Sequence, residues 1–345
     1  MKIIVDAMGG DNAPQAPVLG AIQAGKEYGV DITLVGRGED ILRVLAENGI
    51  NDLPAGVEIA HASEVVEMCD DPANAFRKKK DSSLTVGLTM LKEGAGDAFV
   101  SAGSTGALLA GATLVTKRIK GIRRAALAPV VPTGNGGAVL IDCGANAECP
   151  PEYLLQFAYM GSYYAEKVLG RPNPKVGLLN IGAEPSKGTS LQTAVYPMLE
   201  EAGRAGRVNF TGNVEAREAV EGAVDVIVAD GYSGNIFLKT MEGTGLFLAL
   251  EIKKMFKKSA RTKLAALMVS DGLKEFKKLM SADEVGGTAL LGIAKPVIKA
   301  HGSSDAYAIQ NAVRQAKQYI EAGIIQSIEE NIDVMRLAAP AASEN

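Results

Sequence analysis

Five polar loops carry the residues of this chain that are best suited to chemistry. Each loop combines Gly with Asp, Asn, Ser, Thr or Lys, and each follows a short run of apolar residues. The loops lie at residues 6–11, 101–106, 142–146, 180–188 and 230–235. Any one of them could be an ordinary turn, because turns need the same residue types. Five such loops together predict a binding site for a small polar ligand.

The loop at residues 101–106 is the candidate anion site. The residues that could cradle an anion there are Ser101, Gly103, Ser104, Thr105 and Gly106. They precede a helix expected at residues 107–116, whose free amides and positive dipole end attract negative charge. The alternative is an ordinary Ser/Thr helix cap. The loop lacks the GxxxxGK[ST] pattern and no strand carries GxGxxG, so we expect phosphate rather than a nucleoside triphosphate or a dinucleotide.

Two lysines are the candidate cations of the site. Lys187 lies in a loop with Gly at both ends, and Lys239 follows the loop at 230–235. Either could neutralise a phosphate or a developing oxyanion, or could be a solvated surface lysine. The two histidines, His61 and His301, are either structural or general bases. With so few histidines, and with Asp common at strand ends, we expect no metal site.

A covalent enzyme intermediate is not indicated. There is no GxSxG elbow, and Cys143 and Cys149 lie beside Gly, Pro and acidic residues rather than beside a base. The three cysteines show no CxxC spacing, and the start MKIIVDAMGGD lacks a signal-peptide apolar segment. A reduced, cytoplasmic location is therefore expected. The net charge of -4 gives no general attraction to nucleic acid.

Alternating strands and helices are predicted to position these loops. Candidate strands lie at residues 2–6, 31–36, 57–62, 97–102, 138–143, 175–181, 208–212 and 225–230. Several are apolar throughout, which is typical of parallel strands buried on both faces. With 345 residues, 47% apolar and 39 glycines, the chain is long enough for a large core. The predicted fold class is α/β, a doubly wound, mostly parallel sheet with helices on both faces.

The last third of the chain is predicted to be helical. Strand signals stop near residue 240, and helices are expected at 242–258, 263–280, 305–322 and 324–337. No linker or internal repeat supports a sequential division into domains. We therefore expect one two-lobed catalytic domain over residues 1–337 and a frayed tail at 338–345.

Residues 251–280 form a basic, amphipathic segment. It contains nine Lys or Arg against three acidic residues. Its candidate contact residues are Lys253, Lys254, Lys257, Lys258 and Arg261. Apolar residues recur among them at helical spacing. The segment could be a helix packed on the body with a solvated charged face, or it could bind an anionic partner such as an acidic protein or a membrane surface.

The loops also occur in an order that closely resembles the bacterial PlsX family, the acyl-ACP:phosphate acyltransferases of phospholipid synthesis. The matching blocks are DAMGGDNAP (6–14), FRKKKDSS (76–83), SAGSTGALLA (101–110), KGIRRAALAPVVPT (120–133), IDCGAN (141–146), VGLLNIGAEPSKGTS (176–190), FTGNVEARE (210–218), DGYSGNIFLKTMEG (230–243) and KAHGSSD (299–305). The resemblance extends from Met1 to about residue 325. One departure is Ser104, where the family usually has Asn.

The resemblance implies a fold similar to isopropylmalate dehydrogenase and phosphotransacetylase, a homodimer, and a cytoplasmic protein with peripheral membrane association. It implies transfer of a long-chain acyl group from acyl carrier protein (ACP) to inorganic phosphate, without a cofactor. The acyl phosphate would supply a membrane acyltransferase.

The residues of the polar loops are compatible with this reaction. Phosphate is itself the nucleophile, so the enzyme must mainly position it and stabilise the developing charge. We expect the 101–106 loop to cradle phosphate. The residues expected to carry the chemistry beside it are Lys187, Asn180 and Lys239. The residues expected to shape the cleft are Asp6, Asn146, Asp230 and Asn235.

Two other functions are compatible with parts of the pattern. A dehydrogenase of similar fold would need a nicotinamide cofactor, and the missing dinucleotide fingerprint disfavours it. A non-catalytic acyl-ACP sensor would keep the basic segment without the chemistry at the strand ends. Absorbance assays with NAD and phosphate-dependent thiol release distinguish the three.

Overall fold

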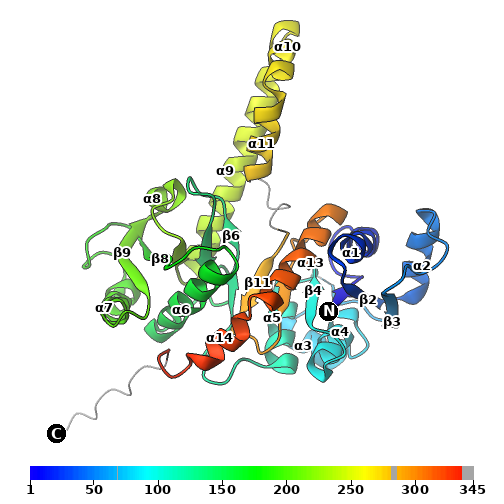
Figure 1. The fold of residues 1–345 in the computed structure, drawn as a ribbon, viewed down its shortest axis with the longest axis horizontal. Coiled ribbons are helices and arrows are strands. Elements are labelled where there is room, and N and C mark those ends of the chain that lie inside the picture. The colour runs from blue at the N-terminus through cyan, green and yellow to red at the C-terminus, as the bar shows by residue number, and fades with distance from the viewer. Residues whose placement is uncertain (68, 281–285, 336–345) are drawn as a thin grey trace.

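Two β-sheets form the framework of the protein in this computed structural model, which describes residues 1–67, 69–280 and 286–335 (Figure 1). The seven-stranded sheet has the order β3 (Val57–His61), β2 (Asp31–Gly36), β1 (Lys2–Asp6), β4 (Ala98–Ser101), β12 (Val297–Lys299), β11 (Thr288–Leu291) and β5 (Ala126–Ala128). The five-stranded sheet has the order β6 (Val130–Val131), β7 (Ala138–Ile141), β10 (Val226–Val228), β8 (Lys175–Asn180) and β9 (Asn209–Glu215). The predicted α/β class is confirmed.

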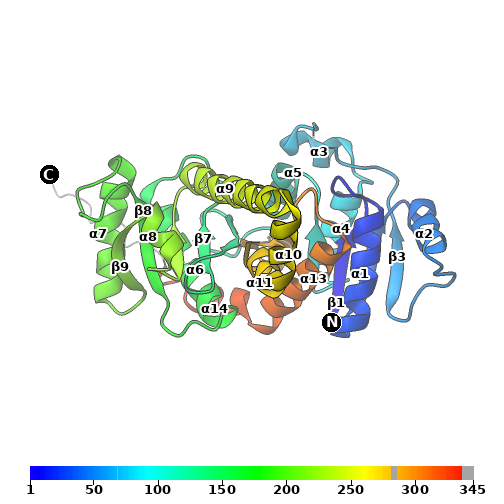
Figure 2. The same ribbon diagram turned by 90° about the horizontal axis from the view of Figure 1, so that it is seen from above.

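Helices connect and cover the strands (Figure 2). In the first half they are α1 (Gln15–Tyr28), α2 (Gly38–Glu47), α3 (Pro72–Lys78), α4 (Ser83–Glu93), α5 (Thr105–Gly111), the π-helical η1 (Ala112–Thr116) and α6 (Pro151–Lys167). In the second half they are α7 (Ser190–Arg204), α8 (Ala216–Glu221), α9 (Gly231–Lys257), α10 (Ala260–Met268), α11 (Ser270–Met280), α13 (Ala306–Glu321) and α14 (Ile324–Glu330).

Parallel pairing places the loops at shared sheet edges. In the first sheet, β4 pairs in parallel with both β1 and β12. In the second, β10 pairs in parallel with both β7 and β8. Because parallel strands end at the same edge, the loops after β1, β4 and β12 are neighbours, as are the loops after β7, β10 and β8. Strand β11 is antiparallel to β12 and β5.

Alternate residues of the strands bury opposite faces of each sheet. Ile3 and Val5 of β1 pack in one apolar cluster with residues of α1 and α13. Ile4, between them, packs in a second cluster with residues of α4 and α5. This alternation is the period of two expected of a strand covered on both sides. It explains why these strands are apolar throughout.

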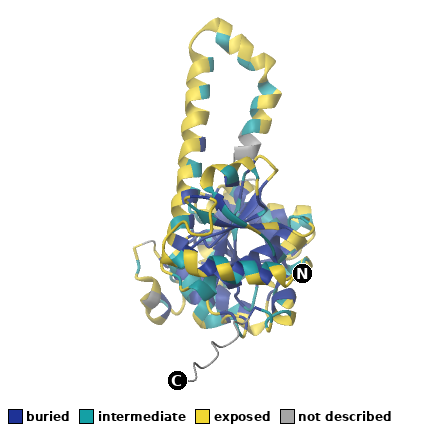
Figure 3. Ribbon diagram, turned by 90° about the vertical axis from the view of Figure 1, so that its left-hand side faces the viewer, coloured by how far each residue is buried: buried dark blue, intermediate teal, exposed yellow. Residues whose placement is uncertain are grey.

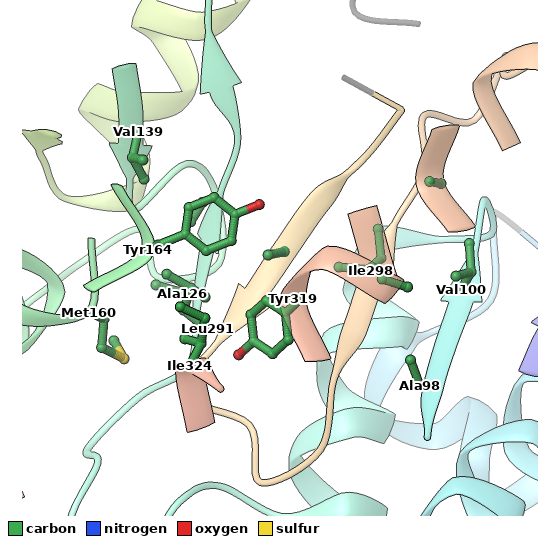
Figure 4. Packing of buried hydrophobic residues seen from close by; sticks show 14 of the residues in the cluster. Ala98, Val100, Ala126, Val139, Met160, Tyr164, Leu291, Ile298, Tyr319 and Ile324 are labelled. Atoms are coloured by element: carbon green, nitrogen blue, oxygen red, sulfur yellow. The ribbon is translucent and has the colours of Figure 1, made fainter. Parts of the chain in front are cut away.

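One apolar cluster extends through both sheets (Figure 4). Tyr164 of α6 and Tyr319 of α13 meet there with ring centroids 6.2 Å apart. Gln315 donates a hydrogen bond from Nε2 to the Tyr164 hydroxyl over 2.9 Å. Helices α6 and α13 therefore pack directly on each other.

An arm made of the distal part of α9 together with α10 and α11 projects from this body (Figures 1 and 3). No residue of α10 is buried. Apolar side chains are exposed along the arm, with Leu267 at 72% and Met268 at 82% exposure. Lys253, Lys254, Lys257, Lys258 and Arg261 are also exposed, so these basic residues are not packed on the body of this chain.

The eight predicted strands are confirmed, but the absence of strands after residue 240 is wrong. Strands β11 and β12 are short and bounded by Gly292 and Pro296, so they lack the long apolar run that identifies the others. Strands β5 and β6, with three and two residues, are also additional to the prediction. Between residues 98 and 116, the longest uncharged stretch forms β4, a loop, α5 and η1.

The predicted helix bounds need three corrections. Helix α9 begins at Gly231 rather than at 242, because Asp230 caps it. The helix predicted at 263–280 is two helices, since Val269 leaves the helical region at φ -106° and ψ 15°. Helix α14 ends at Glu330 rather than at 337. The predicted tail at 338–345 lies outside the described residues.

Candidate functional site

A cavity of about 760 Å³ lies where the edges of the two sheets meet. Its walls come from the loops after β4, β7 and β12, from the chain around β5 and β6, and from α9. Its polar lining includes Thr105, Gly106, Asn235, Lys239, Lys299 and His301. Its apolar lining includes Leu109, Leu127, Val130, Leu238 and Met241. The cavity therefore joins polar groups at strand ends to an apolar wall.

The first half of the predicted anion loop is held by internal hydrogen bonds. Buried Ser101 donates from Oγ to Oδ2 of Asp6 over 2.7 Å, and its Oγ accepts from the Gly103 amide over 3.0 Å. Asp6 Oδ1 accepts from the Met8 amide over 3.1 Å. Burial raises the pKa of the Asp6 carboxyl, although these hydrogen bonds act in the opposite direction. Asp6, Ser101 and Gly103 therefore brace the loop beneath the cavity.

The second half of the loop reaches the cavity. Ser104 is the N-cap of α5, and its Oγ accepts from the Ala107 amide over 3.5 Å. The Ser104 hydroxyl thus caps the helix. Thr105 and Gly106 follow it and line the cavity. The structure brings these two of the five predicted cradle residues to the cavity wall.

The loop after β7 and the start of α9 are packed so closely that Gly is required at their contacts. A Cβ at Gly234 would lie 2.0 Å from the Asp142 carbonyl oxygen, and one at Gly144 would lie 2.6 Å from Asn235 Nδ2. Gly144 has a φ of +105°, a conformation that favours Gly. This packing fixes Asn235 at the cavity wall.

Asp230 and Asn146 hold the same region together from outside the cavity. Asp230 caps α9 by accepting from the Ser233 amide over 2.9 Å. Asn146 donates from Nδ2 to the carbonyl oxygen of Ala125 over 2.8 Å and to Oδ2 of Asp142 over 3.0 Å. Both residues hold chain segments next to the lining, and their role in shaping the cleft stays a prediction.

Lys239 lies one helical turn beyond Asn235 on α9 and also lines the cavity. Its Nζ forms an ion pair with Glu242 Oε2 at 2.7 Å. Both side chains are accessible, so the pair is screened by solvent and exchanges readily for another partner. An anion in the cavity could therefore compete with Glu242 for this ammonium group.

Lys187 and Asn180 lie apart from the residues that line the cavity. Both belong to the β8 end of the second sheet, where Asn180 donates from Nδ2 to the Lys187 carbonyl oxygen over 3.0 Å. Lys187 is exposed. Since β8 pairs in parallel with β10, this loop lies at the same sheet edge as the start of α9. The described structure does not bring Lys187 to the cavity wall.

The cavity wall also holds polar residues that the predicted site did not include. They are Glu242, Glu275, Thr288, Lys299 and Ser304, together with His301, which the sequence left as either structural or a general base. Lys299 ends β12 and is paired in register with Ser101 of β4. Asn12 donates from Nδ2 to the carbonyl oxygens of Ser303 and Ser304 over 3.0 and 3.1 Å, which ties their loop to the β1 loop. Lys299, His301 and Ser304 all lie in the KAHGSSD block, which could have pointed to them. The sequence of that block does not show, however, that Lys299 and Ser304 are buried.

Neither Cys143, which lines the cavity, nor Cys149 is suited to attack. Burial raises the pKa of Cys143 to about 12 and that of Cys149 to about 11. The thiolate is the reactive form, and at neutral pH it is a very small fraction of either group. Within the described residues there is no group of three or more His, Cys, Asp or Glu side chains placed to hold a metal ion. No helix in that part of the chain is both long and apolar enough to span a bilayer.

Comparisons with known proteins agree on one family. The family profile described as Fatty acid synthesis protein matches residues 1–327. A phosphate acyltransferase of Alkaliphilus oremlandii is 49% identical over 335 residues, covering 96% of this chain and 97% of the relative. A phosphate acyltransferase of Thermoanaerobacterium thermosaccharolyticum is 46% identical over 335 residues, covering 97% and 98%.

The fold is also that of a solved structure of different sequence. A phosphotransacetylase from Streptococcus pyogenes aligns with a TM-score of 0.62 at 20% identity, covering 93% of this chain and 94% of that one. At that identity the likeness establishes the architecture.

Proposed function

The chain belongs to the PlsX family of fatty acid synthesis proteins and is an enzyme of acyl transfer to phosphate, and we propose that its acyl donor is a long-chain acyl-ACP. A phosphate oxygen attacks the thioester carbonyl carbon, so that a C–O bond forms and the C–S bond breaks. The products are an acyl phosphate and ACP, whose leaving sulfur takes up a proton. The acyl phosphate serves a membrane acyltransferase of glycerophospholipid synthesis.

The observation that carries this proposal is the composition of the cavity. It places Thr105, Gly106, Asn235 and Lys239 against an apolar wall that includes Leu238 and Met241. A substrate with an anionic or polarised end and a long acyl chain needs both kinds of surface. Thr105 and Gly106 bind the phosphate, and Ser101, Gly103 and Ser104 hold their loop.

Charge stabilisation supplies the remainder of the catalysis in this proposal. Lys239 and Asn235 face the tetrahedral intermediate, whose oxyanion needs donors already in place. Lys187 and Asn180 complete the site from the neighbouring β8 loop, at the edge that β8 shares with β10. Phosphate is already ionised at neutral pH, so no enzyme nucleophile is needed. The protonated, buried Cys143 thiol is consistent with direct transfer.

The projecting arm is the proposed docking region for the acyl donor and the membrane. Its exposed lysines and Arg261 suit the acidic surface of ACP and an anionic lipid surface. Its exposed Leu264, Leu267 and Met268 suit insertion at a lipid interface. We propose a cytoplasmic homodimer that is peripherally associated with the membrane and requires no cofactor, metal or nucleic acid.

Incubation of the purified protein with palmitoyl-ACP and inorganic phosphate tests the reaction. We expect release of the ACP thiol together with acyl phosphate, both followed by mass spectrometry. Sulfate in place of phosphate is the matched control and should give no thiol release. Thiol release without acyl phosphate would identify a hydrolase, and dependence on added NAD would identify a dehydrogenase; either result excludes the proposal.

A further inference from the structure

Two polar side chains in the cavity wall, Lys299 and Ser304, are buried and lack some of the hydrogen bonds that they could form. Lys299 is 8% exposed and Ser304 is 4% exposed. Both line the cavity, as does His301 between them in the chain. Neither has a place in the site that the loops after β4, β8 and β10 predict.

The Lys299 ammonium has no acidic side chain in direct contact among the described residues. Its Nζ donates to the carbonyl oxygens of Ala102, over 3.3 Å, and of Ala300. Within the described residues it forms no ion pair. An ammonium group has three donors, so one donor remains unmatched. Asp6 and Asp11 act on its charge without forming an ion pair with it. A buried charge of this kind is destabilising unless a partner is supplied.

The Ser304 hydroxyl is also unmatched. Its Oγ is buried and has no hydrogen-bond partner among the described residues. Its backbone is fixed, because the Ser304 amide donates to the His301 carbonyl oxygen over 3.1 Å. Native proteins seldom leave a buried hydroxyl without a partner. An acceptor in the cavity would satisfy it.

One ligand would satisfy both groups. An anion with several oxygen acceptors supplies the missing negative charge to Lys299 and an acceptor to Ser304. Charge-assisted hydrogen bonds of this type are short and roughly twice as strong as neutral ones. Lys299 is paired in register with Ser101, so its strand ends beside the loop that leads to Thr105 and Gly106.

We propose that Lys299 and Ser304 form a buried phosphate subsite, with Nζ and Oγ donating to oxygens of the attacking phosphate. The inference rests on the proposed function, in which phosphate is the acyl acceptor. It assigns the buried cation of the site to β12 rather than to the exposed Lys187. Lys239 remains available for the oxyanion.

The surroundings make this subsite sensitive to pH. Burial lowers the pKa of Lys299 to about 8; the charges of Asp6 and Asp11 act against this shift and that of Lys239 adds to it. His301 also lines the cavity, and its Nδ1 accepts from the Ser303 amide over 3.3 Å. Only the ammonium form of Lys299 favours an anion. Anion affinity should therefore fall as the pH rises through about 8.

Calorimetric titration of the full chain with sulfate tests the subsite without requiring turnover. Sulfate has the shape of phosphate and does not titrate between pH 7 and 9. We expect Lys299→Met to weaken sulfate and phosphate binding by about tenfold or more, and Ser304→Ala by about threefold or more. In kinetics, Lys299→Met should raise KM for phosphate while KM for acyl-ACP changes little.

Lys295→Met is the matched control, because Lys295 precedes β12 at the opposite end of the strand and does not line the cavity. It should leave sulfate affinity unchanged. The wild-type protein gives an arm that needs no variant: its sulfate affinity should fall about tenfold between pH 7 and pH 9. His301→Gln should retain that fall, because the imidazole is not the group responsible.

Sulfate affinity that is unchanged in Lys299→Met, or that stays level from pH 7 to 9 in the wild type, overturns the subsite even if acyl phosphate is formed. The two proposals can fail separately. A wild-type protein that makes no acyl phosphate but binds sulfate through Lys299 would overturn the proposed reaction and support the subsite.

Discussion

Ser101 donates a hydrogen bond to Asp6 across neighbouring strands, from Oγ to Oδ2 over 2.7 Å, with both side chains buried. The bond joins the loop after β1 to the loop that leads to the cavity. Ser101→Ala would remove the donor and leave a buried carboxylate oxygen without it. We expect the free energy of unfolding, measured in urea, to fall by about 1–3 kcal/mol.

Ser303→Ala is the comparison for this change, since Ser303 lies in the neighbouring loop and is exposed. It should change the free energy of unfolding by less than about 0.5 kcal/mol. If Ser101→Ala is as stable as the wild type, the hydroxyl does not brace the loop. Direct contact with phosphate would then be the better explanation of the role of Ser101.

Gly144→Ala should reduce activity by displacing Asn235. The new Cβ would lie 2.6 Å from Asn235 Nδ2, at a position with a φ of +105°. A shift of this donor by about 1 Å would cost on the order of a hundredfold in kcat. Steady-state kinetics on the folded variant measures it.

Gly206→Ala provides the control for backbone strain in that experiment. Gly206 also has a positive φ, +68°, but nothing lies within 4 Å of its missing Cβ. It should lose some stability and keep its kcat. Equal losses of kcat in the two variants would show that strain, rather than the position of Asn235, is responsible.

The strands could be predicted from the sequence because the residues that they bury are nearly consecutive and apolar. Lys2–Asp6 and Asp31–Gly36 have the same bounds in the prediction and in the structure. Each begins with a charged residue, continues with mostly apolar residues and ends in a polar or small residue. The polar loops followed from the strand ends, and parallel pairing then determined which loops meet.

The burial of Lys299 could not be predicted in the same way. A lysine at a strand end is usually solvated, and nothing in Val297–Lys299 indicates otherwise. Its burial results from the position of β12 between β4 and β11, which are far apart in sequence. Conversely, Lys187 has the Gly-flanked loop of a functional residue, but the fold leaves it exposed.

Lys187→Ala tests whether that exposed lysine takes part in the reaction. If it stabilises the oxyanion, kcat should fall by about two to three orders of magnitude with no change in stability. Lys175→Ala is the matched control, because Lys175 is exposed at the other end of β8. Activity above about half of the wild-type value in Lys187→Ala would remove this residue from the site.

The buried ammonium of Lys299 should also appear in the pH dependence of stability. Its pKa is lowered from 10.5 to about 8 by burial, so the folded protein binds this proton more weakly than the unfolded chain does. The ligand-free protein should therefore gain stability as the pH rises from about 8 to 10.5. The gain for this group is at most about 3 kcal/mol.

The difference between wild type and Lys299→Met isolates that contribution. The variant should be the more stable protein near pH 7, with an advantage that shrinks toward pH 10. Urea unfolding at several pH values, without phosphate or sulfate, measures it. A constant difference across this range would mean that Lys299 titrates as an exposed lysine.

The arm should separate its two proposed partners by their chemistry. Four exposed lysines lie at the end of α9, just before α10: Lys253, Lys254, Lys257 and Lys258. Replacing all four with Glu reverses the local charge. We expect weaker flotation with anionic liposomes and a higher KM for acyl-ACP, since each nearby Lys contributes about 1 kcal/mol at a charged surface. Added salt should reduce both interactions in the wild type.

The apolar residues of the arm distinguish the lipid surface from the carrier protein. Leu264, Leu267 and Met268 are exposed on α10, so replacing them with Ser removes apolar area that insertion would bury, while retaining the charge. This variant should lose flotation and keep its KM for acyl-ACP. The charge-matched control for the four-lysine variant replaces four exposed lysines of the body with Glu: Lys26, Lys78, Lys92 and Lys175. It should alter neither flotation nor the KM for acyl-ACP. Unchanged flotation and unchanged KM in both arm variants would mean that the arm contacts neither partner.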